Sequence, residues 1–402
     1  MKSIKYILIT LILAIIGCSG GKSREGSVKN EEDKITISLP YSINLLDVIS
    51  KVHSENLSSI SNNISYIPLE TKSECLLRRI NEYVFFNDKL IVSDFSRLYQ
   101  FDNQGKFISK ISEKGEGPSD YTYINSIVKN DKSNSFYLFT AGKINIYDQK
   151  LQYSKSIPNT ERMYFGKSTP EGIFLMYLGC LYRLVGDTTT IYSFVELDTL
   201  GNVLTKIPNS SPIESSFNGM ILGTVPLYKH KESMRFMDYG NDTLFTYTKN
   251  EGKVPYAIFN LGSMKRDVDI SRYNEQQIAE LSSKFAIYNI CEDDRFLYIS
   301  LVWGVDYNKF QYILFDKNTG ELKNLGNHGF VNDIDGGVSF FPQSIEDDGT
   351  KVMWMDADSF IEKISSSDYQ TQKDKYKEKF DNIRELASKK EDDDNPIFII
   401  TK

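Results

Sequence analysis

The sequence predicts an all-β fold: a six-bladed β-propeller of four-stranded blades, with a short helical insert and a C-terminal helix. The first observation is segment 89–108, KLIVSDFSRLYQFDNQGKFI, which reads as three short strands separated by two tight turns. The second is the return of this pattern, since Asp102, Asp148 and Asp198 begin equivalent turns about 50 residues apart, the length of one blade. The third is the content of 25 Tyr and 24 Phe, residues that pack well on a pleated sheet.

Six groups of strands follow one another along the chain. Asp-x-x-Gly turns at Asp102–Gly105 and Asp198–Gly201 connect strands within them, because the Asp side chain bonds its own backbone and Gly takes a positive φ. Residues 182–189 interrupt the third group as an insert. The predicted blades cover residues 77–111, 123–158, 163–208, 223–261, 286–326 and 340–357.

The sixth group has too few strands for a complete blade. The chain ends in NPIFIITK, a further strand pattern, while Tyr66–Thr71 forms a short strand before the first blade. We expect the terminal segment to be the third strand of blade six and Tyr66–Thr71 to be its fourth. Sharing one blade between the two ends of the ring removes open sheet edges.

Two segments break the repeat with helical spacing. Residues 271–285 place Ile278, Leu281 and Phe285 on one face. Residues 369–391 carry apolar side chains at helical intervals within a charged segment. For the second segment, an amphipathic helix packed on the propeller rim is favoured over a helix that binds a partner.

The N-terminus has the pattern of a processing signal. Lys2 and Lys5 precede the apolar run Tyr6–Ile16, which is too short to span a membrane. The run ends in Ile15-Ile16-Gly17-Cys18, which resembles the bacterial lipobox, so Cys18 is the expected lipidation site; a plain secretory signal is the alternative. A lipid on Cys18 makes the membrane a partner of the chain.

Four parts are therefore expected: a lipoprotein signal peptide over 1–17, the lipidated Cys18 with a flexible tether over 18–33, an N-terminal preamble over 34–63 and the propeller over 64–402. The tether is rich in Gly, Ser and charged residues. No acidic patch follows Cys18. The expected location is the bacterial cell envelope, with the protein anchored to the outer membrane and facing the periplasm.

Composition excludes several classes of function. The chain has 54 acidic and 47 basic residues and a net charge of −7 without a basic stripe, so no nucleic-acid partner is expected. Cys75, Cys180 and Cys291 have no metal-binding spacing and are interpreted as buried thiols. No phosphate-binding loop, nucleophile elbow or dinucleotide fingerprint occurs, so no cofactor is expected.

Metal-dependent chemistry has little support in the sequence. Enzymatic propellers collect several His and carboxylate ligands at the channel, whereas this chain has only His53, His230 and His328. Residues 332–336 and 346–349 offer clustered carboxylates but lack the spacing of a calcium loop, and Asp-Gly turns explain them. We therefore expect no catalytic residues and no metal site.

A binding surface is expected at one mouth of the central channel. In propellers the loops that join second to third strands, and one blade to the next, meet at this mouth. Aromatic side chains beside carboxylates and arginine suit a sugar or a peptide, although turn chemistry explains each residue singly and Asp94 and Arg97 can pair with each other. The candidate binding residues are Asp94, Arg97, Tyr121, Lys143, Asp242, Trp303, Asp306, Tyr307 and Asp356.

Several motifs together indicate a family. Segment 89–121 resembles an NHL-type propeller repeat. YIPLETKSECLL, the GEGPSDY turn, GNDTLFTY and the terminal NPIFIITK resemble the six-bladed β-propeller lipoprotein family of Bacteroidota, over roughly residues 63–402 plus the leader. The family's turn usually reads GPGEY, whereas Ser119 stands here in place of its second Gly. The resemblance implies six blades, a cell-envelope location and no catalytic residues.

The predicted function is a ligand- or protein-binding propeller module, with a glycan, a peptide or an envelope protein as the ligand. A glycan role is implied by the habitat of the family that the chain resembles. The alternative is a metal-dependent hydrolase or lyase acting at the central channel, because the fold by itself hosts both kinds of function.

Overall fold

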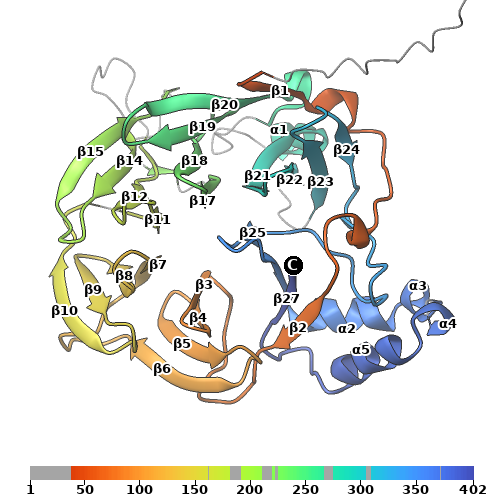
Figure 1. The fold of residues 1–402 in the computed structure, drawn as a ribbon, viewed down its shortest axis with the longest axis horizontal. Coiled ribbons are helices and arrows are strands. Elements are labelled where there is room, and N and C mark those ends of the chain that lie inside the picture. Colours follow the sequence, from red (N-terminus) through yellow and green to blue (C-terminus); the bar gives the residue numbers. More distant parts are fainter. Residues whose placement is uncertain are drawn as a thin grey trace, which may run out of the picture. The chain divides into compact units, whose positions relative to one another are not determined.

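The chain forms a six-bladed β-propeller, as the sequence predicted. In the computed structural model, which describes residues 38–161, 163–181, 192–210, 220–221, 225–266, 275–304, 309–371 and 373–402, six antiparallel sheets of four blade strands surround one axis (Figure 1). In blades one to five the strands follow chain order from the axis outward. Predicted insert residues 182–189 lie outside the described residues.

Blade one consists of β3 (Glu82–Phe86), β4 (Lys89–Ser93), β5 (Arg97–Asp102) and β6 (Phe107–Glu113). Blade two consists of β7 (Ile124–Asn130), β8 (Ser135–Thr140), β9 (Lys143–Tyr147) and β10 (Tyr153–Pro158). Blade three consists of β11 (Phe165–Ser168), β12 (Phe174–Tyr177), β14 (Tyr192–Leu197) and β15 (Val203–Pro208). A separate two-stranded sheet pairs β13 (Cys180–Leu181) with β16 (Met220–Ile221).

Blade four consists of β17 (Leu227–His230), β18 (Ser233–Met237), β19 (Thr243–Thr248) and β20 (Gly252–Asn260). Blade five consists of β21 (Phe285–Glu292), β22 (Phe296–Trp303), β23 (Phe310–Asp316) and β24 (Leu322–Asn324). Blade six consists of β25 (Ser344–Ile345), β26 (Lys351–Met355), β27 (Ile397–Thr401) and β2 (Ser65–Pro68).

Blade six combines both ends of the propeller. Its order is β25-β26-β27-β2, so β27 is the third strand and β2 the fourth. Ile67 lies opposite Phe398 and Tyr66 opposite Ile399. This pairing is the one that the sequence predicted, with the fourth strand shorter than expected because Pro68 ends it.

Aromatic side chains join neighbouring blades. Phe194 of blade three and Phe236 of blade four have ring centroids 4.3 Å apart, and Tyr83 of blade one lies 4.9 Å from Phe398 of blade six. Strands such as β4 and β12 are buried on both faces because each blade is packed between two others. The high Tyr and Phe content is therefore core packing, worth about 0.5–1.5 kcal/mol per aromatic pair beyond area burial.

The preamble runs along the outer side of three blades. Strand β1 (Tyr41–Asn44) pairs in parallel with β20 as a fifth strand of blade four. A 3-10 turn (Leu45–Asp47) follows. The backbone then bonds blade five through His53 N and Asn324 O at 2.7 Å. Ser61 Oγ donates to Lys402 O of blade six at 2.8 Å.

The helical segments differ in detail from the prediction. Helix α1 (Glu275–Glu280) and a 3-10 turn (Leu281–Ser283) occupy the predicted insert, whose first residues lie outside the described part. The C-terminal helix predicted within 369–391 is present but is not continuous: α4 ends before Lys377, whose φ of +45° breaks the helical path. The C-terminal helices are α2 (Ala357–Ser365), α3 (Ser367–Gln370), α4 (Lys373–Tyr376) and α5 (Glu378–Ser388).

These helices pack against blades five and six (Figure 1). Tyr369, Phe380 and Ile383 are buried in one core cluster with Tyr298 and Ile399. Their apolar faces are thus covered by the propeller, as expected for a helix on its rim. Among the described residues, no helix is long and apolar enough to cross a membrane.

Candidate functional site

The two ends of the ring carry different side chains. We call the end where first strands turn into second strands the first-turn end. The opposite end, where second strands turn into third strands and the chain enters the next blade, is the second-turn end. All predicted binding residues within the described part lie on segments of the second-turn end.

Asp94 and Arg97 are used inside their own turn. Asp94 Oδ1 accepts hydrogen bonds from the backbone N–H groups of Ser96 and Arg97, and Oδ2 accepts from Arg97 Nε at 3.0 Å and a second guanidinium nitrogen at 2.7 Å. The Asp94 side chain is 0% exposed. The pair therefore shapes the β4–β5 turn, which was the alternative interpretation of the sequence.

Tyr121 and Lys143 support the GEGPSDY turn. Tyr121 is buried, with its hydroxyl 3.1 Å from the carbonyl oxygens of Ser96 and Ser112. Lys143 Nζ donates to Pro118 O at 2.8 Å. Neither side chain presents its polar group to a ligand.

Of the other predicted residues, two bond to neighbouring side chains and one is exposed. Asp242 pairs with Lys265 at 2.7 Å, and Trp303 donates from Nε1 to Gln311 Oε1 at 3.1 Å. Asp356 precedes α2, is exposed and makes no side-chain hydrogen bond to the helix start. Asp306, Tyr307 and Cys18 lie outside the described residues.

Three residues that the sequence prediction missed lie on the second-turn end. Phe95, in the β4–β5 turn, has a φ of +73°, a left-handed conformation that bulky residues rarely adopt. Its ring stacks on Tyr123 with centroids 5.6 Å apart and planes 28° apart. Arg79 places its guanidinium carbon 5.8 Å from the Phe95 centroid. The signal in the sequence was a Phe at the centre of a turn, where Gly or Asn is usual.

The charge of Arg79 connects this stack to Asp356. Burial and the nearby Asp358 raise the pKa of Asp356, whereas Arg79 opposes that rise. Burial likewise raises the pKa of Tyr123, again opposed by Arg79. We call Arg79, Phe95, Tyr123 and Asp356 the mouth cluster.

The mouth cluster keeps its polar groups open. Tyr123 is 48% exposed, and Arg79 and Asp356 are exposed as well. Within the part of the chain that the structure describes, the Arg79 guanidinium and the Asp356 carboxylate make no hydrogen bond to another residue. These two groups are thus available to a ligand, in contrast to Asp94 and Arg97.

The first-turn end is crossed by ion pairs between alternating blades. Lys129 of blade two lies 3.2 Å from Glu346 of blade six. Lys229 of blade four pairs with Asp347 of blade six and lies 3.5 Å from Asp131 of blade two. Burial would lower the pKa of Lys129, but these carboxylates outweigh burial and raise it. Because the partners come from non-adjacent blades, the ion pairs close this end across the axis.

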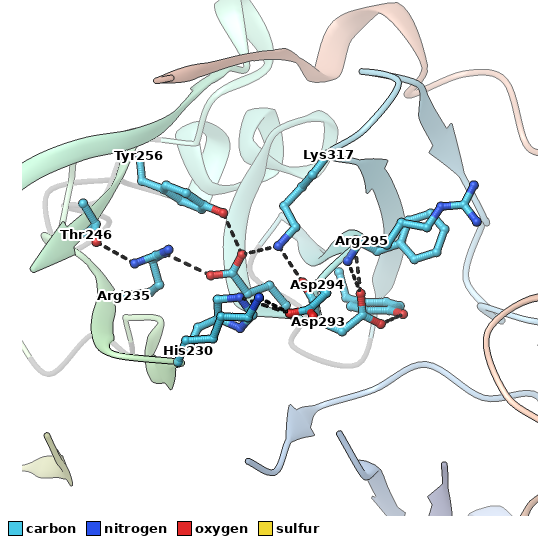
Figure 2. A network of polar contacts seen from close by, with 12 residues as sticks. His230, Arg235, Thr246, Tyr256, Asp293, Asp294, Arg295 and Lys317 are labelled. Carbon is cyan, nitrogen blue, oxygen red and sulfur yellow. Dashed lines mark hydrogen bonds and ion pairs between the residues drawn. The ribbon is translucent and has the colours of Figure 1, made fainter. Parts of the chain in front are cut away.

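A buried ionic network joins blades four and five at the same end (Figure 2). Glu292 is bound by Arg235 at 3.0 Å, by Lys317 at 2.8 Å and by the Tyr256 hydroxyl at 2.8 Å. Arg235 lies over the Tyr256 ring, with its guanidinium carbon 3.9 Å from the centroid. Burial and the Glu292 charge raise the pKa of Tyr256. Each charge has an opposite charge as neighbour, so the network holds two blades together.

The titratable groups next to this network are also paired. Asp293 accepts from the Tyr298 hydroxyl at 2.7 Å, and Lys231 bonds Asp294 at 2.7 Å. His230 Nε2 is 3.9 Å from Asp294, and burial lowers the His230 pKa. These contacts leave no converging set of open acids and bases among them.

The candidate calcium segments are engaged in internal contacts. Asp333 accepts from Ser58 Oγ at 2.6 Å, Asp335 accepts from Asn332 at 2.7 Å, and Asp348 pairs with Lys402 at 2.5 Å. No group of three or more His, Cys, Asp or Glu side chains within the described ranges is arranged to hold a metal ion. Cys75 and Cys291 are buried free thiols.

One carboxylate in the inner strands has a strongly shifted pKa. Glu82 of β3 accepts from the Ile127 N–H at 2.6 Å and the Ser126 hydroxyl at 3.2 Å. Burial raises the pKa of Glu82 to about 7, although Lys167 and these hydrogen bonds act in the opposite direction. Ser126 in turn accepts from Gly166 N–H at 3.1 Å, so this contact couples blades one, two and three.

Comparison with known proteins places the chain in a family. The family model described as a domain of unknown function, DUF4934, matches residues 40–402. The chain belongs to the DUF4934 family. The DUF4934 match begins next to β1 and includes all six blades. It does not test the predicted likeness to NHL repeats or to a lipoprotein family. No curated protein matches the chain.

Solved structures resemble this DUF4934 protein in fold. A protein of Bacteroides fragilis, described as a candidate exported protein, is 19% identical with a TM-score of 0.64, over 90% of this chain and 98% of that one. A DUF4221 member from Bacteroides vulgatus is 11% identical with a TM-score of 0.47, over 71% and 92%. An extracellular domain of a two-component system from B. thetaiotaomicron is 12% identical with a TM-score of 0.39, over 72% and 32%. The first likeness shows the fold alone.

Proposed function

We propose that this DUF4934 protein is a lipid-anchored binding module of the bacterial cell envelope, which takes a polar organic ligand at the second-turn end. The anchor is a lipid on Cys18, and the body faces the periplasm from the outer membrane. The basic and apolar leader that ends at Gly17-Cys18 supports the anchor. The description of the Bacteroides fragilis protein as a candidate exported protein agrees with this location.

The observation that carries the proposal is the contrast between the two ends of the ring. At the first-turn end, Lys129 and Lys229 are neutralised by carboxylates from other blades. At the second-turn end, the mouth cluster exposes an aromatic stack beside an arginine and a carboxylate that make no hydrogen bond to another described residue. Small-ligand sites are lined mainly by apolar and aromatic side chains, with a few polar groups that fix the orientation of the ligand.

The residues of the mouth cluster favour binding over catalysis. Nucleophilic catalysis needs a nucleophile within hydrogen-bond reach of a base, itself oriented by a third group. The mouth cluster consists of two aromatic rings, an arginine and a carboxylate, groups that position a ligand by stacking and charge.

The binding site is tested by thermal shift of the full chain in detergent, against panels of glycans and peptides. Ligands that bind the folded state raise the melting temperature by mass action. We expect at least one panel to raise it in the wild type and in Tyr153→Ala, a control on the outer strand β10, but not in Tyr123→Ala. A ligand that shifts all three proteins equally contradicts the second-turn end as the site.

The anchor is tested separately by Cys18→Ser. We expect the wild-type protein to be found with the membrane fraction and to incorporate labelled fatty acid, and the variant to be found in the soluble fraction without label. Labelling that persists in Cys18→Ser contradicts the anchor and leaves the binding site untouched.

A further inference from the structure

The conformation of Phe95 holds an aromatic ring at the second-turn end at an energetic cost. A left-handed backbone costs a non-Gly residue roughly 1–2 kcal/mol, and the fold compensates with specific contacts. Asp94 caps the turn on one side, and Phe95 O accepts the Ile124 N–H at 2.8 Å on the other. Strained backbone that is held in this way is found mainly at functional sites.

The stack gives Tyr123 a fixed orientation. Phe95 covers one side of the Tyr123 ring, while 48% of the residue remains exposed. A ring that is held in place loses little conformational entropy when a ligand packs on its open face. The apolar C–H face of a sugar ring, or another flat apolar surface, can pack there.

Arg79 supplies a recognition group of defined chemistry. Its guanidinium is oriented over Phe95 and carries five N–H donors in one plane, none of which is donated to another described residue. A planar guanidinium with open donors binds a carboxylate through two parallel hydrogen bonds. Asp358 is close enough to Asp356 to raise the pKa of the Asp356 carboxyl, and an open carboxylate accepts hydrogen bonds from hydroxyl groups.

We propose that the mouth cluster binds a carboxylated saccharide, such as a uronic acid unit of an oligosaccharide. The sugar ring packs on Tyr123, its carboxylate pairs with Arg79, and its hydroxyl groups donate to Asp356. This inference rests on the proposed binding function and names the ligand class of the same site.

The charge balance of the cluster selects against polyanions. Asp356 lies near the positive charge of Arg79 and has Asp358 as a neighbouring carboxylate, so a chain of closely spaced phosphates or sulfates would meet negative charge beside the arginine. A ring with one carboxylate among several hydroxyl groups places its single negative charge on Arg79 and its donors on Asp356. A neutral sugar has no carboxylate to accept the two parallel hydrogen bonds that the Arg79 guanidinium can donate.

The test is isothermal titration of the full chain in detergent with uronate oligosaccharides and with the same oligosaccharides after chemical reduction of their carboxyl groups. We expect the wild type to bind the carboxylated form about 10- to 100-fold more tightly than the reduced form. Arg79→Ala should remove this difference, and Arg79→Lys should keep part of it, because lysine retains the charge but lacks the fork.

Arg78→Ala is the matched control, since Arg78 is the exposed neighbour of Arg79 in the same connection. It should bind both forms as the wild type does. Melting temperatures of all variants show whether each one is folded. Equal affinity of the wild type for both forms, or an equal loss in Arg78→Ala and Arg79→Ala, overturns the proposal.

The proposed binding function and this inference fail in different ways. If peptides bind in a Tyr123-dependent manner while both saccharide forms do not, the acidic-saccharide inference is wrong and the binding site stands. If saccharides bind equally well to Tyr123→Ala, both the site and the inference are wrong.

Discussion

Ile67 and Phe398 lie opposite each other in blade six, one from the start of the propeller and one from its last strand. Phe398 is completely buried and contacts Tyr83 of blade one edge-on. Strand β27 therefore pairs with β26 and β2 and also packs against the next blade. The ring is closed by residues at the two ends of the described propeller.

Removal of the last eight residues, Asn395–Lys402, should prevent the ring from closing. The deletion leaves β26 and β2 without their shared partner and exposes sheet edges. We expect loss of the cooperative thermal transition, measured by circular dichroism, together with aggregation. Lys402→Ala, which changes only the terminal side chain, is the control. A truncated protein that melts like the full chain contradicts closure by β27.

Asn395→Ala tests a single polar contact in the same closure. The buried Asn395 amide donates to Glu70 O at 2.8 Å and Cys75 O at 2.9 Å, and its oxygen accepts from Leu77 N–H at 2.8 Å. Because its loss leaves buried partners unsatisfied, we expect the free energy of unfolding in urea to fall by roughly 3 kcal/mol. Asn202→Ala, in an exposed turn, should change it by less than about 0.5 kcal/mol.

Glu292→Gln tests the ionic network between blades four and five. The substitution keeps the shape of the side chain but leaves Arg235 and Lys317 without their buried counter-charge. We expect a loss of about 3–5 kcal/mol in the free energy of unfolding. Glu385→Gln, which breaks the exposed pair with Lys389, should have no measurable effect. Equal effects of the two substitutions would show that the buried network is not stabilising.

Glu82 should contribute a distinct pH dependence of stability. Its folded pKa of about 7 lies above the ordinary value of 4.5, so between these pH values the folded state binds more protons than the unfolded state. Its contribution is thus favourable at low pH and is lost as pH rises through this window. Urea unfolding at pH 5, 6, 7 and 8 should show a fall in stability for the wild type relative to Glu82→Gln. Glu116→Gln, at an exposed site, should show the same dependence of the free energy of unfolding on pH as the wild type. If Glu82→Gln also shows the wild-type dependence, the shifted pKa of Glu82 is contradicted.

Phe95→Gly separates stability from binding. Glycine adopts a φ of +73° without strain, which returns roughly 1–2 kcal/mol, while the loss of a half-buried ring costs about as much. We expect the free energy of unfolding to stay within about 1 kcal/mol of the wild type while ligand binding is lost. Phe101→Gly, in the core, should cost more than about 3 kcal/mol. A large loss of stability in Phe95→Gly would assign Phe95 to packing.

Local patterns in the sequence predicted most of the fold. The alternation in segment 89–108 corresponds to β4 and β5, and the terminal NPIFIITK contains β27. These strands are recognisable because side-chain alternation and turn residues are short-range properties. The interruption of the C-terminal helices was not predicted, because the positive φ at Lys377 leaves no trace in the spacing of the apolar residues.

The candidate site was only partly predictable. Sequence placed Asp94, Arg97, Tyr121 and Lys143 at the second-turn end, but it could not show which polar groups pair with each other. Turn hydrogen bonds occupy these four residues, whereas Arg79 and Asp356 make no hydrogen bond to any residue that the structure describes. The stack of Phe95 on Tyr123 joins a turn of blade one to the connection into blade two, and a contact of this kind has no periodic signature.

By itself, the sequence determined the propeller, its number of blades and the strands that close it. Each of these follows from short-range patterns that repeat along the chain, namely turn residues and the alternation of buried and exposed side chains. Only the tertiary structure decided which charges are neutralised and which remain available. Lys129 and Glu346 belong to blades that are not neighbours, and they meet because six blades around one axis bring distant turns together. The ends of the ring differ for this reason, and the candidate function follows from that difference.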